Sequence, residues 1–190
     1  MRLRLALLML VNAAVLVSLS ATAAEPVSLF DGRTLDGWNA IACEAVVQDG
    51  AILLKAGNGL VQTAKKYRDF VLEYEWKALK ADGWDSGVYF RYDQVPAGRP
   101  WPKRYQVNLR KGMEGDLDGF PAGKNPVAVK AGDWNRFELT VRGRKASLKV
   151  NGQPAWQVDG LEERDSHIAL QAEVPGGGQF LFRNIRLTAR

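Results

Sequence analysis

Apolar and polar residues alternate with a period of two over several short stretches of the chain, which is typical of β-strands. Over residues 84–91 this period places Asp85, Gly87, Tyr89 and Arg91 on one face. The opposite face carries a serine, a valine and a phenylalanine. The segment therefore predicts a strand with one side against a core and a second side that presents a carboxylate, a phenol and a guanidinium.

Three further segments, 70–77, 103–110 and 167–173, divide in the same way. Their polar sides carry Glu73, Glu75 and Lys77; Gln106, Asn108 and Arg110; and His167, Gln171 and Glu173. Antiparallel sheets with one buried side have this pattern. Two interpretations stay open at this point: the polar sides are simply solvated, or some of them form a binding surface.

Strand-like runs separated by turn signals fill the rest of the chain, and no amphipathic pattern of helical period exceeds ten residues. The candidate strands are 45–48, 51–55, 60–63, 69–77, 87–93, 104–110, 134–141, 145–150, 153–158, 167–172 and 179–188. Asp49-Gly50 and Asn151-Gly152 are two-residue hairpin signals because both positions tolerate a positive φ. The pattern predicts an all-β fold, folded over itself as a two-sheet sandwich.

Two segments do not read as strands. Residues 94–103 contain three prolines, and residues 111–130 contain four glycines and two prolines. Long irregular loops within a compact domain are usually functional or disordered. Trp101 and Met113 favour partial order.

The N-terminus has the pattern of a secretory signal peptide. Arg2 and Arg4 precede an apolar run from Leu5 to Leu19, and small residues follow at 21–23. Removing residues 1–23 with their two arginines would leave 167 of the 190 residues and lower the formal charge from +5 to +3. We therefore expect an exported protein, periplasmic or extracellular, of one domain and without a membrane span.

Composition excludes several classes of chemistry. A small positive charge without clustered basic and aromatic residues makes nucleic acid an unexpected partner. With one cysteine, Cys43, there is no disulfide or CxxC metal site. With one histidine, His167, and no nucleophile elbow, a Ser/His/Asp triad is not favoured. The sequence indicates no oligomeric state.

Residues 27–190 resemble one protein family along almost their whole length. The motifs that carry the resemblance are SLFDGRTLDGW (28–38), DGAI (49–52), GNGLVQT (57–63), YRDFVLEYEW (67–76), SGVYFR (86–91), YQVN (105–108), GDWN (132–135), VNG (150–152) and FRNIRL (182–187). The chain is thereby identified as similar to the 3-keto-disaccharide hydrolase domain family, also described as 3-keto-glucoside 1,2-lyase and 3-keto-2-hydroxyglucal hydratase.

The resemblance implies a concanavalin A-like jelly roll and activity on the glycosidic bonds of 3-keto-glycosides. A ketone at C3 acidifies the hydrogen at C2, so elimination can proceed through an enolate, and water then adds to the 2-hydroxyglucal. The route needs a base near C2, a cation or donors near the C3 oxygen, and an acid for the leaving oxygen.

We expect these roles to fall on residues of the polar strand faces. The candidate catalytic residues are Glu75, Arg91, His167 and Glu173, and the candidate substrate-binding residues are Trp84, Asp85, Tyr89, Gln106, Asn108 and Gln171. Arg91 is the candidate for stabilising the enolate, with Glu75 expected in the same concave cleft. A divalent cation held by oxygen ligands is the alternative to Arg91.

Structural roles compete with each of these assignments. Glu75 and Arg91 can form an ion pair across strands, His167 can serve only the fold, and Trp84 and Trp101 can cap the core. Some members of the family carry Asp-His-Gly after the Leu-Gln of the late strand, where this chain continues with Ala172-Glu173. That departure puts a histidine-dependent step in doubt.

Two other functions fit the same pattern. A non-catalytic carbohydrate-binding jelly roll would use the aromatic and amide residues without an acid or base. A retaining glycosidase would need two carboxylates about 5 Å apart. Glu73 and Glu75 share a strand face, but the E-x-D-x-x-E motif of jelly-roll glucanases is absent.

Overall fold

The computed structural model describes residues 25–190, and the predicted signal peptide lies outside them. The all-β prediction is confirmed, because these residues form eleven strands and no helix. The strands are β1 (Val27–Ser28), β2 (Trp38–Gln48), β3 (Ala51–Thr63), β4 (Phe70–Ala78), β5 (Gly87–Tyr89), β6 (Gln106–Asn108), β7 (Asn135–Arg142), β8 (Lys145–Val150), β9 (Gln153–Asp159), β10 (Ala169–Val174) and β11 (Phe180–Ala189).

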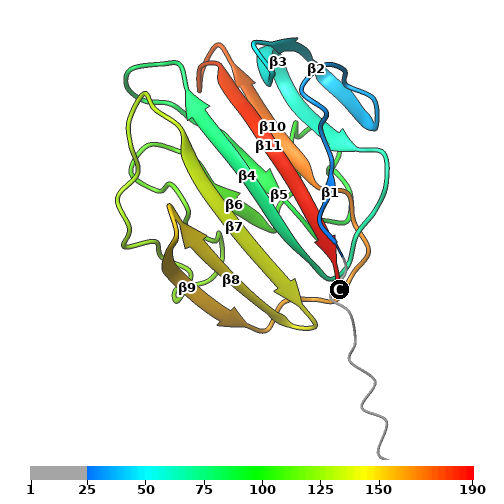
Figure 1. The fold of residues 1–190 in the computed structure, drawn as a ribbon, viewed down its shortest axis with the longest axis vertical. Helices are drawn as coiled ribbons and strands as arrows, with labels where there is room; N and C mark the ends of the chain where they lie inside the picture. The colour runs from blue at the N-terminus through cyan, green and yellow to red at the C-terminus, as the bar shows by residue number, and fades with distance from the viewer. Residues whose placement is uncertain (1–24) are drawn as a thin grey trace, which may run out of the picture.

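The eleven strands form one continuous antiparallel sheet, in which nine follow the order β6-β5-β10-β3-β11-β4-β7-β8-β9 while β1 pairs with β11 and β2 with β3. The long strand β3 joins two halves of this sheet, because residues 52–54 pair with β11 and residues 57–62 pair with β10. In Figure 1 the half with β5, β6 and β10 lies behind the half with β4, β7 and β11. The two halves are packed around the core, as an edge-to-face contact of Phe70 on β4 with Phe90 after β5 shows, with ring centroids 6.4 Å apart.

The predicted hairpin turns are confirmed. Asp49-Gly50 joins β2 to β3 with φ values of 50° and 75°, and Asn151-Gly152 joins β8 to β9 with φ values of 50° and 83°. Positive φ at both central positions is the geometry that matches the twist of the flanking strands.

The predicted alternation of faces is also confirmed. Residues of β4 are alternately buried and half-buried along the whole strand. Val88, Val107 and Leu170 belong to the main hydrophobic core, whereas their neighbours Tyr89, Gln106 and Gln171 do not. The assignment to a two-sheet jelly roll of the concanavalin A type stays a prediction.

Each half of the sheet has a polar side turned away from the core. We call the polar side of β6, β5, β10 and β3 the amide face; it carries Tyr89, Gln106, Asn108, Gln171 and Glu173. We call the polar side of β11, β4 and β7 the ion-pair face; it carries Glu73, Glu75, Arg136, Arg183 and Arg186.

The two segments predicted to be irregular contain no strand. A bridge between Val107 and Leu117 holds the segment 111–130 against β6. The segment 94–103 reaches β3 and β10 through Trp101, whose indole N–H donates to the carbonyl oxygens of Gly59 and Ala172. Residues 25–190 contain no helix long and apolar enough to cross a membrane.

Candidate functional site

A chain of amide hydrogen bonds crosses three strands on the amide face. Gln106 on β6 donates through its side-chain nitrogen to the side-chain oxygen of Gln171 on β10. Gln171 in turn donates to a carboxylate oxygen of Glu173 at 3.0 Å. Both glutamines are buried, at 7% and 4% exposure, so their side chains hold fixed positions. The carboxylate of Glu173 is thereby oriented by two residues that were predicted to bind substrate.

Gly87 on β5 makes this chain sterically possible. The register pairs Tyr89 with both Gln106 and Ala169, so β5 lies between β6 and β10. A Cβ atom at Gly87 would lie 1.9 Å from the side-chain nitrogen of Gln106, which is an impossible contact. The glycine therefore allows the Gln106 side chain to lie across β5 and reach Gln171.

Asp85 lies beside this chain at the start of β5. It lines a hollow of about 280 Å³ together with Glu173 and Arg110. Burial raises the pKa of Asp85 from 3.8 to about 6, and the charges of Glu173 and Asp118 act in the same direction while Arg110, 3.8 Å away, opposes them. A carboxyl group with this pKa changes protonation state near neutral pH, as a general base or acid must.

Asp118 adds a third carboxylate from the irregular segment 111–130. The side-chain amide of Asn108 donates to it at 3.3 Å, and burial raises its pKa. Tyr89 is 4% exposed and its pKa is raised by burial first, then by the charges of Asp118 and Asp85. Its hydroxyl forms no hydrogen bond within residues 25–190, so it is free to donate to a ligand.

We call Asp85, Tyr89, Asp118 and Glu173 the acidic cluster. Within residues 25–190 no group of three histidine, cysteine, aspartate or glutamate residues has the geometry to hold a metal ion. The site combines carboxyl groups, a phenol and amides, which can exchange protons with a bound molecule and hydrogen-bond to its hydroxyl groups.

Arg91 does not take part in this site, contrary to the prediction. β5 ends at Tyr89, and Arg91 has a φ of +46°, which redirects its side chain away from the strand face. The guanidinium is fully buried and donates to the carboxylate of Asp69 at 2.6 Å and to the carbonyl oxygens of Arg68, Gly143 and Glu162. Its donors hold three segments of the chain together and are not available for an enolate.

Glu75 also lies elsewhere, and the expected common cleft with Arg91 is wrong. Glu75 is on the ion-pair face, where Arg183 of β11 donates to it at 2.7 Å. The guanidinium of Arg183 in turn lies 3.8 Å from the ring centre of Trp134. Glu75 therefore has a cationic partner, though a different one from Arg91.

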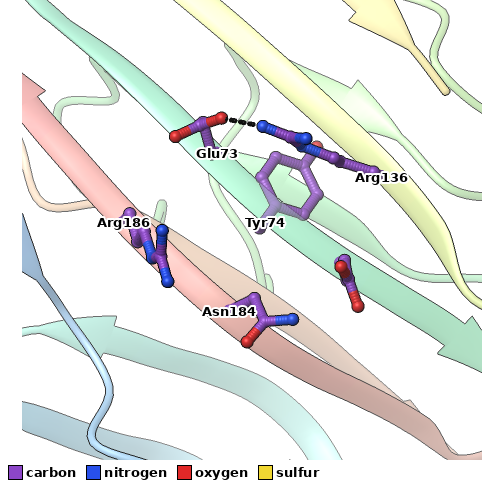
Figure 2. Close-up of a pocket in the computed structure, with 6 residues that line it drawn as sticks. Glu73, Tyr74, Arg136, Asn184 and Arg186 are labelled. Atoms are coloured by element: carbon purple, nitrogen blue, oxygen red, sulfur yellow. Dashed lines mark hydrogen bonds and ion pairs between the residues drawn. The ribbon is translucent and has the colours of Figure 1, made fainter. Parts of the chain in front are cut away.

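A second hollow, of about 240 Å³, is found on the ion-pair face (Figure 2). Side chains of Glu73 on β4, Arg136 on β7, and Asn184 and Arg186 on β11 surround it, and Glu73 is paired with Arg136. With Glu75 also paired, the two glutamates that share this strand face are both neutralised by arginines. This arrangement offers no free acid and base for a retaining glycosidase.

Of two more predicted residues, His167 lies apart from the acidic cluster and Trp84 lies beside it. The Nδ1 atom of His167 is 2.7 Å from the carbonyl oxygen of Thr63, and His167 is six residues, about 20 Å, from Glu173 along the same strand direction. Trp84 is 3% exposed and packs in the core, with the ammonium group of Lys111 over its ring at 5.4 Å. It also lines the hollow that holds Asp85 and Glu173, and its indole N–H has no hydrogen-bond partner within residues 25–190. The structural interpretation describes His167 better than the functional one, whereas a role of Trp84 in binding stays a prediction.

Asp118 is the site residue that the strand pattern did not single out, whereas Arg110 was placed on a polar strand side but was not among the candidate site residues. Asp118 lies in an irregular segment, where periodicity says nothing about facing. The available signal was the unusual length of that segment, since long ordered loops often carry function.

Residues 25–190 thus form an antiparallel β-fold with a row of amides and carboxylates on one polar side. The sequence matches the model of the 3-keto-alpha-glucoside-1,2-lyase-like domain over residues 25–188, so the chain belongs to this family.

A curated relative is the 3-keto-disaccharide hydrolase of Bacteroides thetaiotaomicron, which is 31% identical over 83 residues. That match covers 36% of this chain and 28% of the relative, so the chain corresponds to well under half of that protein.

Solved structures share the fold at low sequence identity. A candidate glycosyl hydrolase from Parabacteroides distasonis superposes with a TM-score of 0.69 at 17% identity, covering 87% of this chain and 94% of the other. The carbohydrate-binding module CBM66 from Bacillus subtilis superposes with a TM-score of 0.62 at 12% identity, covering 80% and 96%. The fold therefore occurs in both a candidate enzyme and a binding module.

Proposed function

We propose that the protein cleaves 3-keto-glycosides by elimination and hydration, with the acidic cluster on the amide face as its active site. The observation that carries the proposal is that Asp85 and Glu173 line one hollow and that the charges of Asp118, Asp85 and Glu173 all act on Tyr89, whose hydroxyl has no hydrogen-bond partner within residues 25–190. Carboxyl groups that raise one another's pKa in a partly buried site weaken the fold, and such sites are commonly functional.

Asp85 is the proposed base for the C2 hydrogen. Its pKa of about 6 leaves it mostly ionised at neutral pH and still basic enough to accept a proton. No hydrogen bond within residues 25–190 ties up its carboxylate, and Arg110 lies only at 3.8 Å. Glu173 is held by Gln171, which orients its carboxylate to accept hydrogen bonds from hydroxyl groups of the substrate.

Tyr89 is the proposed donor to the C3 oxygen, in place of Arg91. As the bond between C2 and hydrogen breaks, negative charge develops on that oxygen, and a hydroxyl group already free of other partners can donate to it. The enolate then expels the C1 substituent as an alcohol, which takes a proton from a carboxylic acid of the cluster. Water adds to C1 of the 2-hydroxyglucal while C2 regains a proton, so the sum is hydrolysis.

The experiment that tests this proposal is cleavage of a 3-keto-glucoside and its unoxidised parent in D₂O. Elimination and hydration predict cleavage of the keto sugar alone, with deuterium at C2 of the product. Asp85→Asn should abolish both, whereas Glu75→Gln, on the opposite face, should leave them unchanged. Equal cleavage of both sugars without deuterium at C2 would contradict the mechanism.

A carbohydrate-binding module is the second candidate. It is favoured by the likeness to CBM66 and by the three buried amides Gln106, Asn108 and Gln171, which suffice for binding hydroxyl groups. Binding of the keto sugar without turnover or exchange at C2 would support this alternative.

Export and a jelly-roll classification complete the proposal. The pattern of residues 1–23 supports a periplasmic or extracellular location, which a fusion of this segment to a reporter enzyme would test. The pairing of β3 with both halves of the curled sheet supports a two-layer jelly roll of the concanavalin A type.

A further inference from the structure

Trp101 is held in an unusual position on the amide face. Its indole N–H donates to the carbonyl oxygens of Gly59 on β3 and Ala172 on β10, at 3.1 and 3.2 Å. These two residues are directly paired across the strands. One edge of the ring therefore points down onto the sheet, and two strands fix its position.

The strand register gives the neighbours of this ring. The Gly59–Ala172 pair is flanked by the pair Leu60–Gln171 on one side and by Asn58–Glu173 on the other. Trp101 thus stands next to the glutamine and the carboxylate that end the amide chain.

An apolar cluster covers one side of Trp101. Leu60, Tyr89, Tyr92 and Ala169 form a small group separate from the main core, and Trp101 packs against it. Ala169 lies toward the start of β10, whereas Glu173 lies toward its end. Tyr89 belongs to this apolar cluster and also to the acidic cluster, so Trp101 packs beside a residue on which the charges of all three carboxylates act.

The segment that carries Trp101 is fastened to the fold at several points. The hydroxyl of Tyr92 donates to Gln62 at 2.7 Å, and Asp93 pairs with Arg164 at 3.0 Å. These contacts reduce the conformational freedom that a ligand would otherwise have to remove on binding.

We propose that Trp101 is the aromatic wall of the substrate site and selects an uncharged pyranose ring, an inference that rests on the proposed function. A pyranose ring presents C–H groups on its faces and hydroxyl groups at its edge. Its face matches the indole, and its edge matches the amides of Gln106 and Gln171. Arg110 and Lys111 line the hollow with Asp85 and Glu173, but the three carboxylates of the acidic cluster outnumber these two cations. The balance disfavours a sugar that bears a carboxylate or phosphate group.

The test combines kinetics with binding. Trp101→Ala should raise KM for a 3-keto-glucoside by about 10- to 100-fold, through the loss of apolar contact, with a smaller change in kcat. Trp101→Phe keeps an aromatic face and should recover most of the loss, which also guards against a misfolded alanine variant. Trp134→Ala, on the ion-pair face, is the matched control and should leave KM unchanged.

Calorimetry with methyl glucoside and its 3-keto derivative separates this inference from the proposed function. Sugar binding that depends on Trp101, without turnover, would retain the aromatic wall and overturn the enzymatic function. Turnover with an unchanged KM in Trp101→Ala would overturn the wall and retain the function. A wild-type protein that neither binds nor cleaves these sugars would overturn both, and tighter binding of a 3-keto-glucuronide than of the glucoside would overturn the selectivity.

Discussion

Replacement of Asp85 by asparagine should stabilise the protein at neutral pH while it removes activity. Burial raises the pKa of this carboxyl group from 3.8 to about 6, a difference of about two pKa units, equivalent to about 3 kcal/mol. The side chain is 26% exposed, and screening by solvent reduces the expected gain to about 1–2 kcal/mol. Asparagine has nearly the shape of the protonated acid and avoids the cost of the buried charge.

The stability gained by Asp85→Asn should depend on pH. Because the folded state binds the proton of Asp85 more tightly than the unfolded state, wild-type stability falls as the pH rises from about 4 through about 6. The asparagine variant lacks this loss. The difference between the two proteins should therefore be near zero below pH 4 and reach its full value above pH 7.

Urea denaturation followed by tryptophan fluorescence at several pH values measures the difference. In thermal unfolding each kcal/mol corresponds to about 2–4 °C in Tm for a domain of this size. Asp36→Asn is the matched control, since Asp36 is exposed and accepts no side-chain hydrogen bond within residues 25–190. A variant at Asp85 that is less stable than wild type at pH 8, or equally altered at every pH, would refute this reasoning.

Three further outcomes follow from the same contacts. Gly87→Ala should displace the Gln106 side chain, because the new Cβ would lie 1.9 Å from the side-chain nitrogen of Gln106. We expect kcat/KM to fall at least 10-fold and the protein to lose stability. Crystallography of the variant checks the displacement. Arg91→Met should lower the free energy of unfolding by about 3–5 kcal/mol, because Asp69 loses its buried partner. The kcat of the folded enzyme should stay within about twofold of wild type. Chemical denaturation measures the first effect, and rates normalised to the concentration of folded protein measure the second. The kcat/KM of the wild type should fall about tenfold for each pH unit below about 6, as the base Asp85 becomes protonated, and a profile flat from pH 5 to 8 would remove Asp85 from this role.

The sequence by itself determined the family, the all-β class and the two faces of each strand. A period of two is a local property, so the buried sides of β4, β6 and β10 could be read directly from residues such as Val107 and Leu170. The hairpin turns at Asp49-Gly50 and Asn151-Gly152 were equally predictable, because few residue pairs tolerate positive φ at both positions.

Only the tertiary structure decided which polar residues meet. Strand periodicity places Glu75 and Glu173 on polar sides alike, but the strand order assigns them to different halves of the curled sheet. Arg91 continues the pattern of β5 in sequence, yet one positive φ turns its guanidinium to Asp69. Asp118 joins the carboxylates through an irregular segment whose path has no periodicity to read. A site assembled from β5, β6, β10 and two loops depends on contacts between residues distant in sequence, and those contacts are set by register and packing rather than by any local pattern.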